Sequence, residues 1–137
     1  MLTNSTLTQS LMALTIAFRY SCHRRQFLSP TETKETLLID YPLTKYRLMP
    51  LVAQNIAINF ASYKVAILYE TYFKLLTDPT NSIVSEMHCI SSTLKAKSSW
   101  FSTGVIAECR QMLGGHGFSS YSRLGDLYHE NEVNSTW

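Results

Sequence analysis

The sequence predicts an all-α fold: an antiparallel helical bundle that forms a single domain over residues 1–137. Apolar residues recur every three or four positions along most of the chain, and no stretch alternates apolar and polar residues as a half-buried strand does. Proline- and glycine-containing breaks divide this pattern into four segments. At 137 residues, with 45% apolar and 16% charged residues, the chain has the length and composition of one globular domain with its own core.

The first predicted helix covers about residues 2–26. Leu7, Leu11, Leu14 and Phe18 follow one another at spacings of four, three and four, which places them on one face of a helix. Basic side chains follow, where they complement the negative end of the helix dipole: Arg19, His23, Arg24 and Arg25. Ser29-Pro30-Thr31 then predicts a break, because proline disfavours helix in the residue before it.

The second predicted helix covers about residues 42–76. A loop precedes it, with residues 37–39 expected against the core, and Pro42 suits a first helical turn. Pro50 is expected to kink or interrupt the helix. One apolar stripe runs along it, comprising Leu48, Val52, Ile56, Phe60, Tyr63 and Ile67. Residues 77–81, Thr-Asp-Pro-Thr-Asn, predict a compact turn after it.

The third predicted helix covers about residues 81–113 and has the clearest periodicity in the chain. Its apolar stripe comprises Ile83, Met87, Ile90, Leu94, Phe101, Val105 and Met112. Ser98 interrupts the stripe, and a small residue there would let a neighbouring helix approach closely. Gly114 and Gly115 are expected to stop the helix. A shorter helix is predicted at about residues 120–130.

Composition narrows the possible classes of function. A net charge of +2 is too small to indicate nucleic acid as a partner. Cys22, Cys89 and Cys109 form neither a disulfide framework nor a metal-binding motif, so we expect no metal site. No run reaches the roughly 18 apolar residues that a membrane span needs. The N-terminus lacks the features of a signal peptide, and the last three residues are not a peroxisomal address.

Two segments could carry chemistry. In the first, Arg24 and Arg25 offer planar donors that suit phosphate oxygens, and Gln26 and Phe27 add an amide and a ring that could pack against an adenine or flavin. The alternative for this segment is a solvated basic helix end.

In the second segment, Gln111 precedes a glycine-rich stretch that begins at Gly114 and Gly115 and would let a ligand approach the backbone. The alternative is an ordinary helix stop and tight turn. His116 has no orienting partner in the sequence and is interpreted as a turn residue rather than a base. Glu108 is expected on a solvated helix face.

Taken in order, these segments and their surroundings resemble the acyl-CoA oxidase family of the acyl-CoA dehydrogenase superfamily. ALTIAFRYSCHRRQF (13–27) is similar to the family's RRQF region, and LLIDYPLTKYRLMPLVA (37–53) to its LDYQxQQYRLFPLLA segment. IAECRQMLGGHGFSSYSRLGDL (106–127) is similar to its ECRxxCGGHGY signature, and NEVNSTW (131–137) to the residues before its EGDN element. Pro42 departs from the family, which usually has a glutamine there that contacts flavin.

The resemblance implies the first C-terminal helical domain of a peroxisomal, FAD-dependent enzyme that converts acyl-CoA to trans-2-enoyl-CoA with formation of hydrogen peroxide. It implies a homodimer with FAD between subunits, contacted by Arg24, Arg25, Gln26, Phe27, Gln111, Gly114 and Gly115. The family's catalytic base is the glutamate that opens EGDN, which would follow Trp137. The resemblance therefore assigns no catalytic residue to these 137 residues, and we expect them to be inactive alone.

Two other functions remain open on the sequence. A non-catalytic helical dimerisation or interaction module would also lack the base. A protein of the membrane surface would explain the cluster of arginines at positions 19–25 beside an apolar stripe, but its polar faces are rich in Ser, Thr and Asn rather than lysine.

Overall fold

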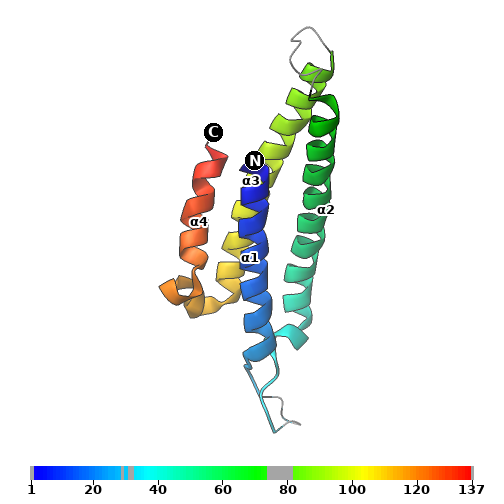
Figure 1. Ribbon diagram of the computed structural model, residues 1–137. Helices are drawn as coiled ribbons and strands as arrows, with labels where there is room; N and C mark the ends of the chain where they lie inside the picture. Colours follow the sequence, from blue (N-terminus) through cyan, green and yellow to red (C-terminus); the bar gives the residue numbers. More distant parts are fainter. Residues whose placement is uncertain (1, 29, 31–32, 74–81, 137) are drawn as a thin grey trace.

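The computed structural model describes residues 2–28, 30, 33–73 and 82–136, and over these residues the chain forms a bundle of four α-helices (Figure 1). They are α1 (Leu2–His23), α2 (Pro42–Tyr72), α3 (Ser82–Met112) and α4 (Leu124–Glu132). Each helix runs opposite to the one before it, so α1 and α3 end at the same end of the bundle (Figure 1). The predicted all-α class and antiparallel bundle are confirmed. β-type pairing within the described residues is limited to one bridge, between Arg25 and Leu37.

The apolar core lies where α1, α3 and α4 meet the first turns of α2. Small residues on α1, Ala13 and Ala17, are fully buried and let its backbone approach α3. Leu48 is the fully buried leucine that α2 contributes. Burying a side chain of this size stabilises the fold by roughly 1.5–3 kcal/mol. The remaining core residues are Leu14, Val105, Ile106, Cys109, Leu113, Leu124 and Leu127.

Buried polar side chains tie the helices together away from this core. The hydroxyl of Ser102 on α3 donates to the carbonyl of Thr6 on α1 at 2.8 Å. The Asn131 amide on α4 donates to the Thr103 hydroxyl on α3, also at 2.8 Å. Ser98, the small residue that interrupts the predicted stripe of α3, is fully buried. Buried hydroxyl and amide side chains therefore link α1 to α3 and α3 to α4.

The observed helix boundaries correct several predictions. α1 ends at His23 rather than at residue 26. The backbone N–H of Gln26 donates to the Thr36 carbonyl at 2.9 Å instead of continuing the helix. Residues 120–122 form a separate 3-10 turn, so α4 begins at Leu124. The predicted end of the second helix at residue 76 and the turn at 77–81 lie outside the described residues.

Pro50 neither breaks nor interrupts α2, which continues from Pro42 to Tyr72. Proline removes the hydrogen bond to the carbonyl four residues earlier. Pro50 and Tyr46 are both exposed, so water can satisfy the carbonyl of Tyr46. Residues 37–39, expected against the core, are half-buried, and Leu38–Asp40 forms a 3-10 turn.

The predicted apolar stripe of α2 is buried only at its beginning. Beyond Leu48 its side chains become exposed, reaching 51% at Ile56, 70% at Phe60 and 66% at Tyr63. By length and composition α2 also qualifies as a membrane-spanning helix, with a mean hydropathy of 1.3 over an 18-residue window. The prediction from the sequence required an unbroken apolar run and therefore missed this helix. Mean hydropathy includes it, because an average tolerates interspersed polar residues. The exposed stripe indicates a surface that another molecule or another part of a larger protein covers.

Candidate functional site

The first candidate segment forms a strap that folds back from the end of α1. The Arg24 amide donates to the Tyr20 carbonyl at 2.8 Å, and the Leu38 amide donates to the Arg24 carbonyl at 2.9 Å. Arg25 pairs with Leu37 and its guanidinium donates to the Glu35 carbonyl at 2.8 Å. Backbone pairing, rather than helix, therefore positions the two arginines, and both side chains are exposed.

Phe27 marks the tightest point of this strap. Its φ of 62° lies in the left-handed region, which is uncommon for a residue other than glycine. Hydrogen bonds hold the conformation: the Thr36 amide donates to the Phe27 carbonyl at 3.1 Å, and the Tyr41 hydroxyl donates to the Gln26 carbonyl at 2.7 Å. The Phe27 ring is 68% exposed, so the strap presents an aromatic surface to solvent.

The second candidate segment is a 3-10 turn, Gly114–Phe118, directly after α3. The predicted helix stop is confirmed: Gly114 has a φ of +58°, a conformation that glycine adopts at little cost. Gly117 is required for a different reason, because a Cβ there would lie 2.0 Å from the backbone oxygen of Arg110. At Gly115, by contrast, a Cβ would meet no atom of the chain within 4 Å. The turn is thus packed against α3 on one side and open on the other.

Arg110 fastens this turn to the bundle. Its Nε donates to the Gly117 carbonyl at 3.3 Å. Its guanidinium carbon lies 5.3 Å from the ring centroid of Phe118 and 5.7 Å from that of Tyr128 on α4. Each such contact contributes about 0.5–1 kcal/mol at an exposed site. Through these contacts Arg110 stabilises the conformation of the turn.

The structure brings the two candidate segments to the same end of the bundle. The Tyr20 hydroxyl, in the last turn of α1, lies 3.2 Å from Nδ1 of His116 in the glycine-rich turn. The interpretation of His116 as a turn residue agrees with its place in Gly114–Phe118. Its partner was missed because Tyr20 is 96 positions away, and no local pattern points to that contact.

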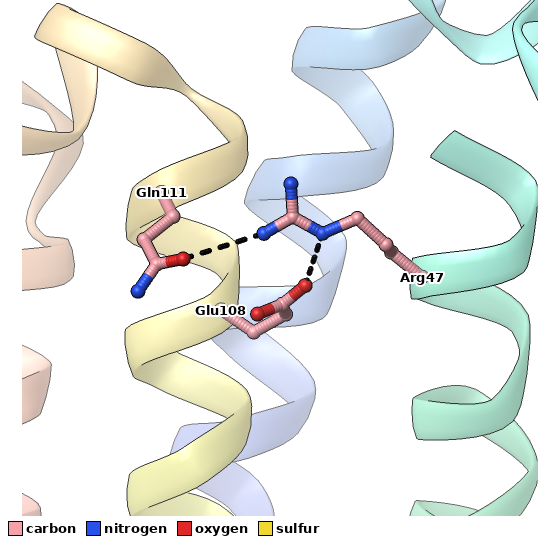
Figure 2. Close-up of polar contacts among 3 residues, drawn as sticks. All are labelled: Arg47, Glu108 and Gln111. Atoms are coloured by element: carbon pink, nitrogen blue, oxygen red, sulfur yellow. Dashed lines mark hydrogen bonds and ion pairs between the residues drawn. The ribbon is translucent and has the colours of Figure 1, made fainter. Parts of the chain in front are cut away.

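A second group that the sequence did not reveal joins α2 to α3 (Figure 2). Nε of Arg47 donates to the carboxylate of Glu108, and Nη2 donates to the Gln111 Oε1 at 3.4 Å. The expectation that Glu108 lies on a solvated face is wrong: its carboxylate is half-buried and paired. The hydrogen bond to Glu108 raises the pKa of Arg47. Burial and, secondarily, the Glu108 charge raise the pKa of Cys109 to about 12.

Basic side chains accompany the helix ends at this end of the bundle. The C-terminal ends of α1 and α3 both carry the partial negative charge of the helix dipole. Arg24 and Arg25 directly follow α1, and Arg110 lies in the last turn of α3, so cations offset both ends. Among the described residues no group of three His, Cys, Asp or Glu side chains could hold a metal ion.

A family model described as "Acyl-CoA oxidase, C-alpha1 domain" matches residues 1–137. The chain belongs to the acyl-CoA oxidase family. It is 36% identical to an acyl-coenzyme A oxidase of Komagataella pastoris, over 90% of this chain and 19% of that protein. It is 34% identical to the peroxisomal acyl-coenzyme A oxidase 3 of Homo sapiens, over 92% of this chain and 19% of that protein. The chain therefore spans about a fifth of the length of these oxidases.

Solved structures of acyl-CoA oxidases share its fold. Arabidopsis thaliana acyl-CoA oxidase 1 superposes with a TM-score of 0.91 at 30% identity, over 99% of this chain and 21% of that one. Caenorhabditis elegans acyl-CoA oxidase-1, crystallised with FAD and ATP, gives a TM-score of 0.88 at 29% identity, over 99% and 21% of the two chains. The bundle described above is thus the helical domain that these oxidases contain.

Proposed function

We propose that these 137 residues are the first C-terminal helical domain of a peroxisomal, FAD-dependent acyl-CoA oxidase of fatty-acid β-oxidation. The reaction converts an acyl-CoA to the trans-2-enoyl-CoA and passes two electrons to oxygen, which gives hydrogen peroxide. The observation that carries this proposal is the contact between Tyr20 and His116, because it joins the arginine strap and the glycine-rich turn at one end of the bundle. The names of relatives such as the human peroxisomal oxidase support the location.

The residues proposed to hold FAD fit an anionic dinucleotide by their chemistry. Arg24 and Arg25 are exposed cations with planar donors that match a pyrophosphate. Gln26 adds an amide and Phe27 an exposed ring suited to stacking on adenine. In the proposed enzyme, FAD supplies the electron acceptor, and this domain supplies positive charge and an open backbone surface that bind it.

The open surroundings of Gly115 are compatible with this fit. Its φ lies outside the left-handed region and a Cβ there would meet no atom of this chain within 4 Å. Neither backbone conformation nor internal packing therefore requires glycine at this position. A ligand that lies close to the backbone of Gly114 and Gly115 would explain why residue 115 has no side chain. Gln111 would contact the same ligand.

We further propose that the oxidase is a homodimer that holds each FAD between two subunits, with an acyl-CoA as substrate. The exposed stripe of α2, including Ile56, Phe60 and Tyr63, supports extensive contacts with other parts of such an assembly. No residue of this chain is assigned as the catalytic base. That role is proposed for a glutamate expected directly after Trp137, so the 137 residues alone would not turn over acyl-CoA.

The test is to sequence the transcript past residue 137 and to purify the complete protein. A Glu-Gly-Asp-Asn element after Trp137, a flavin absorbance spectrum, and acyl-CoA-dependent hydrogen peroxide release are expected. The isolated chain should show no activity in the same assay. A complete protein that binds no flavin and releases no peroxide from any acyl-CoA would contradict the proposal.

The exposed stripe of α2 also favours a second candidate, a non-catalytic helical interaction module. Such a protein would form dimers through α2 without flavin. Light scattering and an absorbance scan on the purified complete protein separate the two functions. A colourless dimer supports the module, and a yellow, flavin-loaded one supports the oxidase.

A further inference from the structure

Arg47 contacts two residues of α3 that lie on the same side of that helix. Glu108 and Gln111 are three positions apart, so their side chains project in nearly the same direction. Figure 2 shows the guanidinium of Arg47 reaching across from α2 to both of them. Its Nε donates to Glu108 and its Nη2 to the Oε1 of Gln111, the latter at 3.4 Å.

This contact decides which way the Gln111 amide faces. A guanidinium has only donors, whereas a carboxamide has one accepting oxygen and one donating NH₂ group. The amide oxygen must therefore face Arg47, and the NH₂ group is turned away from it, as Figure 2 shows. Glu108 in turn holds the guanidinium, since its charge-assisted hydrogen bond fixes the rigid plane at Nε.

We propose that Arg47 is a positioning residue that orients the Gln111 carboxamide so that its NH₂ group is presented outward as a hydrogen-bond donor to the bound flavin dinucleotide. This inference rests on the proposed function of the same site. The phosphate and ribose oxygens of a dinucleotide are mainly hydrogen-bond acceptors. An NH₂ group facing them can donate a hydrogen bond, whereas an amide oxygen would repel them. Gly114 and Gly115 follow in the turn, and a Cβ at either would meet no other atom within 4 Å.

A purely structural role for Gln111 makes a different prediction. In that case Gln111 only helps Arg47 join α2 to α3, and a carboxylate would serve as well or better. Gln111→Glu separates the two roles, because glutamate has the same shape and still accepts from Arg47 but has no NH₂ group. Arg47→Lys is the second variant: it keeps a cation beside Glu108 but loses the planar fork that orients the amide.

The experiment uses the complete, flavin-binding protein and measures the FAD dissociation constant by fluorescence and the Tm of the apoprotein by calorimetry. Gln111→Glu should weaken FAD binding about tenfold or more, because it loses one hydrogen bond and places a negative charge beside an anionic ligand, and it should leave the Tm of the apoprotein unchanged or higher. Arg47→Lys should weaken FAD binding less, and it should have no further effect in the Gln111→Glu background. The controls are Gln54→Glu and Lys45→Met on exposed positions of α2, which should bind FAD as the wild type does.

The outcomes separate this inference from the function on which it rests. If the wild-type protein binds no FAD, the proposed function fails and the inference fails with it. If the wild type binds FAD and Gln111→Glu binds it equally well, only the inference is overturned. If Gln111→Glu loses affinity but Arg47→Lys does not, the loss comes from the added charge or from a donor that Arg47 does not orient, and the positioning role is overturned.

Discussion

The Tyr20 hydroxyl and Nδ1 of His116 lie 3.2 Å apart, and their rings are tilted by 47° with centroids 5.6 Å apart. This pair is a direct side-chain link between the end of α1 and the turn that follows α3. Tyr20 directly precedes the residues that lead into the arginine strap, and His116 lies among the glycines. One hydrogen bond and one ring contact therefore join the two candidate segments, in addition to the packing of α1 against α3.

Replacing Tyr20 by phenylalanine should weaken that link without disturbing the core. Tyr20→Phe keeps the ring contact with His116 but removes the hydroxyl, so we expect a loss of about 0.5–1 kcal/mol in the free energy of unfolding. Urea denaturation followed by circular dichroism measures it. Tyr46→Phe is the matched control, because Tyr46 is 78% exposed and its change should be close to zero. Equal effects of the two variants would show that the Tyr20–His116 bond is not formed in solution.

The glycines of the turn should respond differently to alanine. Gly114→Ala forces a side chain into a left-handed conformation and should cost about 1–2 kcal/mol of stability. Gly115→Ala should change stability by less than about 0.5 kcal/mol, since nothing lies near its Cβ. In the complete protein, however, Gly115→Ala should weaken FAD binding. Unchanged flavin affinity would remove Gly115 from the proposed site.

Gly117→Ala provides the opposite case. Its new methyl group would overlap the Arg110 carbonyl, a backbone atom that cannot move without distorting the end of α3. We expect a loss of about 1–3 kcal/mol or more, the range seen for overpacked sites. Thermal unfolding of Gly117→Ala and Gly115→Ala side by side gives the comparison. A Gly117→Ala variant as stable as Gly115→Ala would mean that the turn is not packed on α3.

Cys109 should be the unreactive thiol of this chain. It is buried and its pKa is raised to about 12, whereas Cys22 and Cys89 are exposed. Because the thiolate is the nucleophile, brief alkylation of the folded protein at about pH 8 should modify Cys22 and Cys89 but spare Cys109. Mass spectrometry of the digested protein identifies the modified positions. Labelling in denaturant, where all three should react, is the control.

The raised pKa of Cys109 also sets a direction for stability against pH. Between its ordinary value of 9.0 and its folded value of about 12, the unfolded chain releases the thiol proton and the folded chain retains it. The contribution of this group is fully present below pH 9 and declines as the pH rises toward 12. Cys109→Ala should flatten the fall in unfolding free energy above pH 9. An unchanged slope would show that Cys109 titrates normally.

Leu48 should be the most sensitive apolar position of α2. Truncating a fully buried leucine leaves a cavity, so Leu48→Ala should cost about 2–5 kcal/mol in unfolding free energy. Leu43→Ala on the same helix is the control, because Leu43 is 66% exposed and its change should stay within about 0.5 kcal/mol. Chemical denaturation of both variants measures the difference. Similar losses at both positions would contradict the placement of the core at the start of α2.

Much of the fold was readable because a buried helix face repeats at the helical period. The stripe of α3 predicted a helix over 81–113, and the structure has one at Ser82–Met112 with Met87 and Val105 buried. Gly114 predicted the end of this helix, because the turn needs a residue that tolerates a positive φ. The stripe of α2 was also regular, yet periodicity records only that a face is apolar, not what covers it. Phe60 and Tyr63 are therefore exposed in this chain despite their regular spacing.

The candidate site was less accessible from sequence because its geometry depends on long-range contacts. Local patterns identified Arg24, Arg25 and the glycines, but they predicted a helix where Gln26 pairs with Thr36. The link from Arg47 to Glu108 spans 61 positions, so charge patterning along either helix gave no sign of it. Contacts of this kind are set by how helices pack, and a single sequence records them only indirectly.

α1 and α3 run parallel, so both end at the same end of the bundle (Figure 1). That end should tolerate insertions and deletions less well than the opposite end. One residue inserted within α3 would rotate everything after it by about 100° and shift it by about 1.5 Å, which would carry His116 away from Tyr20. Extra residues joining α2 to α3 enter at the opposite end and leave that spacing intact (Figure 1). Divergence among relatives by insertion and deletion should thus concentrate between α2 and α3, while the interval from Tyr20 to Phe27 and that from Glu108 to Phe118 keep a constant length.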